Sequence, residues 1–299
     1  MKYELVYAEL TPEGVAEDVF RIHPVNPKDQ SVEIGVTHLH QAGQHRGQPV
    51  ILIHAEFCNR FQWYRRDIPC LAMELISQNF EVWIPEMRGH GLSPANRAYR
   101  RNSLRDYVDY DLPAIQRFVS ERHPTPAIWI GYGTGAMAIA MALELNTLQR
   151  QQMASIALIG MKDARSVLRC ATQGFWDRLA ARRRGMVRSL TSGLDRETEP
   201  YVLLDTLPRP EFKRLATLAH ASTLPPLLLV ELLVDGMTPE SHIGRKLLWA
   251  WGEASKKKVS VPARSLLGAL AQPASYKPIR GALNLWLKGR FVDNIAELT

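Results

Sequence analysis

Trp129-Ile130-Gly131-Tyr132-Gly133-Thr134-Gly135 follows an apolar run that begins at Ala127 and precedes a segment rich in Ala, Met and Leu that extends to about Leu145. A short apolar run bounded by turn residues is typical of a buried strand, and the segment after it has the composition of a helix. The glycines between them predict a tight turn from strand into helix. Such a strand–turn–helix unit is typical of α/β proteins.

Similar units recur on both sides of this stretch. The further predicted strands are residues 17–24, 31–40, 50–53, 80–84, 156–159, 227–233 and 258–261, and the further predicted helices are residues 61–78, 104–121, 240–252 and 280–297. Pro24 and Pro27 are expected in the turn between the first two strands. Pro85 is expected to end the strand at 80–84, and Ser103 to cap the helix that follows it. Alternating strands and helices predict a mostly parallel sheet with helices on both faces.

The alternation is interrupted once. Residues 162–223 look mostly helical and irregular, which predicts a helical cap inserted into the α/β core. The expected organisation is therefore a first core segment at 1–161, a cap at 162–223 and a second core segment at 224–299. A chain of 299 residues is long enough for one such domain and its insertion.

Composition excludes several classes of protein. Hydrophobic residues make up 46% of the chain, but no run approaches the roughly 20 apolar residues of a membrane span. The first residues carry charge and lead to no apolar signal segment, and three cysteines without motif spacing predict neither disulfides nor a cysteine-based zinc site. We therefore expect a cytoplasmic protein. The net charge of +7 favours acidic partners, yet no nucleic-acid-binding motif is present.

Three stretches, in order, resemble the α/β-hydrolase fold superfamily, which includes esterases and lipases. Residues 54–63 resemble its His-Gly loop, and residues 82–93, which read Val-Trp-Ile-Pro-Glu-Met-Arg-Gly-His-Gly-Leu-Ser, are similar to its Asp-x-Arg-Gly-His-Gly-x-Ser segment. Residues 129–135 occupy the place of the Gly-x-Ser-x-Gly nucleophile elbow. A fourth stretch, residues 227–239, is a weaker match to the strand and loop that carry the acid. The resemblance spans about residues 17–290 and implies an α/β-hydrolase fold with a cap.

The position of the nucleophile lacks a reactive side chain. In an elbow, small residues two positions on either side let the central residue adopt a strained backbone conformation. Gly131 and Gly135 fit those flanks, so Gly133 is the expected centre; a centre at Thr134 would place the bulky Tyr132 at a flank. Glycine tolerates the backbone but cannot attack a carbonyl. A dinucleotide-binding glycine motif is not favoured, because position 136 is alanine, and no cofactor is expected.

The other two triad positions differ from each other. The resemblance places the acid at Asp235, although a turn-forming Asp-Gly is an equally good interpretation, and Asp163 is an alternative site. It places Leu266 where the family has its histidine, while His242 lies inside a predicted helix and too early in the chain. Without an imidazole here, nothing takes a nucleophile's proton.

The resemblance also assigns positions around the elbow. The oxyanion hole would use the backbone N–H groups of Thr134 and Glu56, although a Glu56 carboxylate pointing inward would disfavour an oxyanion and could equally point to water. A mainly apolar pocket is expected above Gly133, from loops at the carboxyl ends of the strands and from the cap. Its expected lining is His54, Phe57, Tyr132, Phe175 and Trp176.

Two further features have more than one interpretation. His38 and His40 share one face of a predicted strand, but no third ligand is evident; we favour a solvated strand face and predict no metal site. Residues 162–188 hold eight basic and two acidic residues on an amphipathic pattern. A packed cap helix is favoured over docking on an acidic partner or an anionic membrane. Lys256-Lys257-Lys258 is expected in a solvated loop.

The combined expectation is an α/β-hydrolase-fold protein that has lost serine-hydrolase activity and binds a small apolar ligand or a partner. The elbow Gly-x-Gly-x-Gly-Ala is similar to that of the NDRG proteins, which belong to this fold and are regarded as lacking the triad. Two alternatives remain open: an esterase- or lipase-like enzyme that uses unusual groups, and a regulatory subunit of an active relative. The sequence does not predict the oligomeric state.

Overall fold

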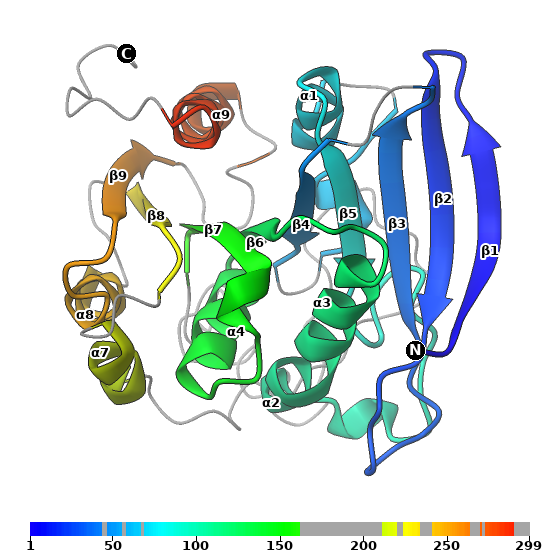
Figure 1. Ribbon diagram of the computed structural model, residues 1–299, viewed down its shortest axis with the longest axis horizontal. Helices are drawn as coiled ribbons and strands as arrows, with labels where there is room; N and C mark the ends of the chain where they lie inside the picture. Colours follow the sequence, from blue (N-terminus) through cyan, green and yellow to red (C-terminus); the bar gives the residue numbers. More distant parts are fainter. Residues whose placement is uncertain are drawn as a thin grey trace, which may run out of the picture.

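The structure, a computed structural model, describes residues 1–43, 47–55, 58–66, 69–161, 211–219, 224–233, 241–263, 270 and 273–289. Within these ranges nine strands form one sheet in the order β1-β2-β3-β5-β4-β6-β7-β8-β9 (Figure 1). The strands are β1 (Tyr3–Leu10), β2 (Val15–Ile22), β3 (Ile34–Gln41), β4 (Pro49–Ile53), β5 (Glu81–Glu86), β6 (Ala127–Tyr132), β7 (Met153–Ile159), β8 (Leu227–Leu233) and β9 (Lys256–Pro262). The helices are α1 (Leu71–Ser77), α2 (Leu104–Asp106), α3 (Leu112–Ser120), α4 (Thr134–Glu144), α7 (Lys213–Ala219), α8 (Ser241–Ala250) and α9 (Pro273–Leu287).

The sheet has an antiparallel and a parallel part. Strands β1, β2, β3 and β5 pair antiparallel, whereas β5, β4, β6, β7, β8 and β9 pair parallel. The chain passes from β4 to β5 on one side and then returns to β6 on the other side of β4. In such a sheet, ligands bind outside the carboxyl ends of the strands at the point where the order reverses.

Two hydrophobic cores lie on the two faces of the sheet. One contains Trp129 of β6 and side chains from α3, α4, α7 and α8, while the other contains Ile128 and Ile130 and side chains from α1 and α9. Neighbouring residues of one strand point to opposite faces, so the apolar run of β6 fills both cores. Figure 1 shows the same division, with α1 and α9 on one side of the sheet and α3 and α4 on the other.

The predicted helix at 104–121 is present as three joined segments. It begins with a capping box, in which the Ser103 Oγ accepts from the Asp106 backbone N–H at 3.3 Å and the Asp106 carboxylate accepts from the Ser103 backbone N–H at 3.0 Å. A π-helical turn at Tyr107–Asp111 then joins α2 to α3. The cap expected at Ser103 is therefore confirmed.

Several predicted boundaries are corrected by the structure. The helix expected at 61–78 begins only at Leu71, because Pro69 lies within that span and disfavours helix before it; Arg60–Gln62 form a short 3-10 turn instead. The last helix runs from Pro273 to Leu287 rather than through 280–297, and residues 290–299 lie outside the described part. Strand β1 was not expected from the sequence.

Pro85 does not end its strand. It lies inside β5 and faces Val36 of β3. The pairing of β4 with β5 extends only to Trp83, so β5 has no neighbour on that side at Pro85. A proline is tolerated where its missing N–H is not needed by a neighbouring strand.

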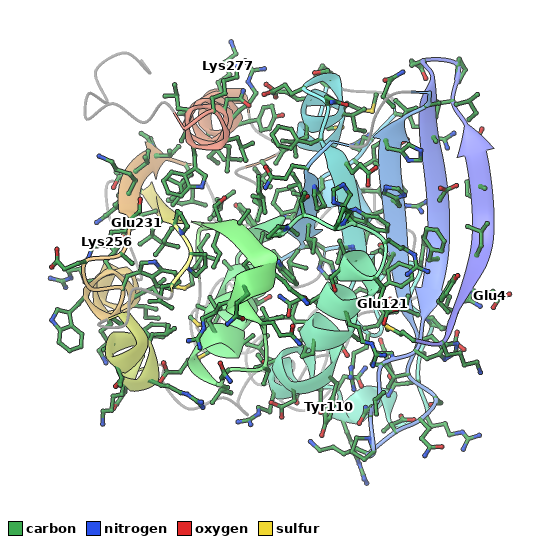
Figure 2. The ribbon with its side chains drawn as sticks, viewed as in Figure 1. Glu4, Tyr110, Glu121, Glu231, Lys256 and Lys277 are labelled. Atoms are coloured by element: carbon green, nitrogen blue, oxygen red, sulfur yellow. The ribbon has the colours of Figure 1, made fainter. Side chains whose placement is uncertain are left out.

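The lysine run at 256–258 is part of strand β9, not a solvated loop. The Lys256 Nζ donates to the backbone oxygens of Leu248, at 2.9 Å, and Gly252, at the carboxyl end of α8. The Lys258 Nζ lies 2.7 Å from the Glu231 carboxylate of β8. Figure 2 shows Glu231 and Lys256 at the same end of the sheet.

Most of the expected cap, residues 162–210 and 220–223, lies outside the described part, including the basic segment at 162–188. Helix α7 falls within the range expected for the cap. Its Leu215 N–H donates to the Glu144 carboxylate at 2.8 Å, so α7 is attached to the end of α4. Among the helices described, none combines the length and apolar character required to cross a bilayer.

Candidate functional site at the turn from β6 to α4

Gly133 forms the turn between β6 and α4. Its backbone has φ 55° and ψ −119°, a conformation that side-chain-bearing residues rarely adopt. Its N–H donates to the Ile159 carbonyl oxygen of β7 at 3.0 Å, which fixes the turn against the neighbouring strand. The chain therefore makes the sharp strand-to-helix turn of a nucleophile elbow, with a glycine at its centre.

The flanking glycines are required by close packing. A Cβ atom at Gly131 would lie 2.7 Å from the Ile139 Cδ1 and 2.8 Å from the Ala136 Cα. At Gly135 it would lie 2.4 Å from the His54 carbonyl oxygen. Neither position has room for a larger residue, as the assignment of the centre to Gly133 predicts.

The residues on either side of Gly133 are both buried. The Tyr132 ring is completely buried and meets the Trp63 ring edge to face, with centroids 6.3 Å apart, in the core on the α1 side. Thr134 is the first residue of α4 and is 4% exposed. The amino end of α4, which carries partial positive charge, thus lies at the centre of the site.

His54 follows β4 and holds two loops together. Its Nε2 accepts a hydrogen bond from the Met87 backbone N–H at 3.0 Å, and its Nδ1 lies 2.7 Å from the Ala55 carbonyl oxygen. These partners define the tautomer, because Nε2 must be the acceptor and Nδ1 must carry the proton. The neutral ring is fully used in fastening the loop after β4 to the loop after β5.

His90 lies beside it in the loop after β5. The two ring centroids are 4.8 Å apart, and the His90 Nδ1 lies 3.2 Å from the Arg88 carbonyl oxygen. Burial, with a smaller contribution from His54, lowers the pKa of His90 to about 3. The His90 ring is therefore neutral near pH 7.

Buried charges anchor the loop after β5. The Glu86 carboxylate accepts the backbone N–H groups of Arg60 at 2.9 Å and Leu92 at 3.0 Å, and burial raises the pKa of Glu86 despite these bonds. The Arg88 Nε donates to both carboxylate oxygens of Asp111 at 3.0 Å. Burial opposes a charged Arg88, but the Asp111 carboxylate outweighs it and raises the pKa of Arg88.

In the loop after β4, the Ala55 backbone N–H donates to the Gln62 Oε1 at 2.8 Å. This bond was not anticipated from the sequence, since a side chain seven residues away gives no local signal. The remaining assigned positions lie outside the described residues: Glu56, Phe57, Asp163, Phe175, Trp176, Asp235, Leu266 and the side chain of His242. Their roles stay predictions.

A pocket of about 170 Å³ lies near the amino ends of the central strands. Its lining includes Gln116, His123, Pro126 and Gln151, from the segments that lead into the amino ends of β6 and β7. It is therefore separate from the turn at Gly133, and the pocket expected there stays a prediction.

The histidine pair on β3 does not lie on a solvated face. His38 is 5% exposed and stacks on Trp83, with ring centroids 3.7 Å apart. The strand register places Asp18 of β2 opposite His38, which supplies the third candidate ligand that the sequence did not reveal. The pairing of two strands had to be known before this residue could be found.

Comparisons with known proteins concern the fold of the chain. No curated protein sequence matches the chain. Among solved structures, the esterase Pf2001 of Pyrococcus furiosus is similar with a TM-score of 0.60 and 12% identity, covering 96% of this chain and 98% of its own. The carboxylesterase CesB of Bacillus subtilis gives a TM-score of 0.56 and 12% identity, covering 91% and 92%. A cold-adapted esterase from an Arctic intertidal metagenomic library gives 0.56 and 14%, covering 98% and 100%.

Identities this low establish the fold and nothing about activity. The family model described as the alpha/beta hydrolase family, however, matches residues 50–283, which is well over half of the chain. That range begins in β4, contains the elbow at Gly133 and ends in α9. This chain belongs to the alpha/beta hydrolase family.

Proposed function

We propose that this chain is a non-catalytic member of the family that binds a small apolar ligand at the turn between β6 and α4. One observation carries the proposal: Gly133 has the backbone of an elbow, φ 55° and ψ −119°, but no side chain. A nucleophile at this position is what would attack a carbonyl carbon in a serine hydrolase. The chain keeps the architecture that presents a ligand and lacks the atom that reacts with it.

The surroundings of Gly133 support the same proposal. Among the described residues of the loops after β4 and β5, the histidines are His54 and His90, and both are neutral and used in holding backbone groups. A serine hydrolase needs an imidazole that can take and return a proton. The His54 Nε2 already accepts the Met87 N–H, and a pKa of about 3 disfavours this role for His90. The amino end of α4 nevertheless provides a partial positive charge that suits an ester or ketone oxygen.

Loss of the side chain also leaves space. Exchanging serine for glycine at the centre of an elbow enlarges the adjoining site, so binding does not have to be lost with catalysis. Pockets of this fold class lie at the carboxyl ends of the strands, which is where Gly133 and His54 are found. The ligand class that we propose is a small apolar molecule with one carbonyl group.

The first experiment tests for catalysis. The purified protein is incubated with a fluorophosphonate probe and with p-nitrophenyl butyrate. We expect no stoichiometric label and hydrolysis at the rate of buffer alone. Stoichiometric labelling of any residue, or saturable turnover, would favour the alternative of a hydrolase with unusual groups.

The second experiment tests for binding, with methyl octanoate as the probe. Gly133→Leu fills the site, and Gly43→Leu is its matched control, because Gly43 has a similarly positive φ of 72° and a Cβ atom at that position would meet nothing within 4 Å. We expect binding to weaken at least tenfold in Gly133→Leu and to persist in Gly43→Leu. No binding to the unaltered protein would turn the assignment toward an interaction subunit.

A further inference from the structure

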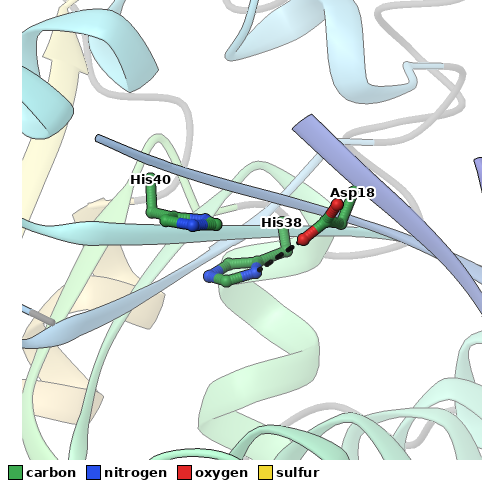
Figure 3. A group of neighbouring side chains, drawn as sticks. All are labelled: Asp18, His38 and His40. Carbon is green, nitrogen blue, oxygen red and sulfur yellow. Dashed lines mark ion pairs between the residues drawn. The ribbon is translucent and has the colours of Figure 1, made fainter. Parts of the chain in front are cut away.

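A cluster of metal-binding side chains lies on the sheet far in sequence from the elbow. Asp18 of β2 and His38 of β3 are direct partners across the strand pair, and His40 follows two residues later on the same face (Figure 3). One donor atom from each of the three residues lies within 4.8 Å of the others. The His38 Nδ1 is 3.9 Å from an Asp18 carboxylate oxygen.

A second carboxylate lies behind His38. The His38 Nε2 is 3.4 Å from a Glu81 carboxylate oxygen of β5, so the imidazole stands between two acids. The ring therefore presents Nδ1 to the Asp18 carboxylate and Nε2 to the Glu81 carboxylate. This is the arrangement in which an imidazole binds a metal ion through one nitrogen while a carboxylate orients the other.

His40 adds a donor that the surrounding protein leaves unused. Its ring stacks on that of His38, with centroids 4.7 Å apart. The His40 Nδ1 is buried and has no hydrogen-bond partner among the described residues. A buried polar atom without a partner costs roughly 1–3 kcal/mol, and a bound ion is one of the explanations for such an atom.

We propose that Asp18, His38 and His40 bind one zinc ion, with water as the fourth ligand. Two imidazoles and a carboxylate are a usual zinc ligand set. Calcium and magnesium prefer oxygen ligands, so the two imidazole nitrogens favour zinc over both. Glu81 has the place of the outer carboxylate that orients a zinc-bound histidine through its second nitrogen. The site is independent of the proposed function at Gly133.

The ligand atoms must approach one another for binding. Zinc bonds of about 2.0–2.2 Å require donor atoms roughly 3.4 Å apart in a tetrahedral site. Packing against Trp83 fixes the His38 ring, whereas the Asp18 side chain is 28% exposed and His40 is only partly buried. Rotation of these two side chains closes the site without moving the strands. The ion then links β2 to β3.

The experiment uses the full chain, purified in chelator and returned to metal-free buffer. Zn²⁺ is titrated by calorimetry, and Co²⁺ is used as a spectroscopic probe, because a tetrahedral site gives intense visible absorption. We expect one ion per chain. Asp18→Asn and His40→Gln should each weaken zinc binding by at least ~100-fold and abolish the cobalt spectrum, and Glu81→Gln should weaken it by about tenfold or more.

His23→Gln is the matched control, since His23 lies beyond the end of β2 and its acidic neighbour in the described part of the chain is Glu33, at 4.0 Å. It should bind zinc as the unaltered protein does. The melting temperature of each variant is measured without metal, so that a folding defect is not mistaken for lost binding; zinc should raise it only where the three ligands are intact. Absence of zinc binding, or binding by His40→Gln and Asp18→Asn equal to that of the unaltered protein, would overturn the proposal.

Discussion

The His54 imidazole and the Met87 backbone are joined by a 3.0 Å hydrogen bond in which Nε2 is the acceptor. This bond connects the loop after β4 with the loop after β5. β4 and β5 are neighbours in the sheet, and β4 also pairs with β6, the strand that leads into the elbow. The hydrogen bond gives His54 a structural role, because it holds the two loops in position.

Replacing His54 by leucine should therefore destabilise the protein. The change leaves the Met87 N–H without its acceptor in the interior, and an unsatisfied buried donor costs about 1–3 kcal/mol. Urea unfolding measures the difference. His23→Leu, at a partly exposed position, should change stability by less than about 0.5 kcal/mol. Equal losses from the two variants would contradict this role for His54.

His90 should make stability depend on pH. Its pKa in the folded protein is lowered from 6.5 to about 3, so between these values the unfolded chain binds a proton that the folded chain refuses. The stability is complete above about pH 6.5 and falls as the pH drops toward 3, by up to about 1.4 kcal/mol per pH unit. Urea unfolding between pH 7 and 5 tests this, and His90→Asn should have a flatter profile than the unaltered protein. Parallel profiles would show that His90 is not the titrating group.

The ion pair of Arg88 and Asp111 should be costly to break. Both side chains are almost completely buried, at 2% and 0% exposure, so Arg88→Met leaves a carboxylate without its partner. The expected loss is about 3–5 kcal/mol, and Arg88→Met with Asp111→Leu should lose less than either single change. Arg117→Met, in the exposed pair with Glu121, is the control and should cost at most about 1 kcal/mol. Additive losses in the double variant would contradict the prediction.

Gly133→Ser should restore little activity. A serine without a base remains a weak nucleophile, and general base catalysis alone supplies about 10²–10⁴-fold. The positive φ of 55° should also destabilise the variant by about 1–3 kcal/mol, as Gly43→Ser at φ 72° controls for. Hydrolysis of p-nitrophenyl butyrate is the measurement, and Gly133→Ser with Leu266→His should exceed either single change. Rapid hydrolysis by Gly133→Ser alone would reveal a base that the described residues do not show.

Much of the fold could be predicted because the relevant signals are local. The apolar run before Gly133, the glycines around it and the Ser103 cap are each readable within a few residues, and each lies where it was expected. β1 was missed because its residues are mostly exposed and its pattern carries no buried face. Pro85 was misread because its effect depends on where β4 ends, which only the assembled sheet decides.

In the candidate sites, too, local features could be predicted and long-range contacts could not. Gly133, Gly131 and Gly135 could be assigned from spacing, since steric limits at a tight turn act between near neighbours. Asp18 could not be joined to His38, because 20 residues and a strand register separate them. Contacts between side chains on neighbouring strands depend on how the strands pair, and the sequence of one strand does not predict that pairing.

The two ends of the described sheet differ in how they would receive another molecule. β9, the last strand of the described sheet, carries three lysines in succession, and lysine on an edge strand disfavours pairing with a second strand. β1 offers Tyr3, Leu5 and Tyr7, each about half exposed, along an edge without lysine. In concentrated samples, pairing of the edge strands of two molecules should therefore start at β1. A single lysine in this strand, Leu5→Lys, should delay precipitation.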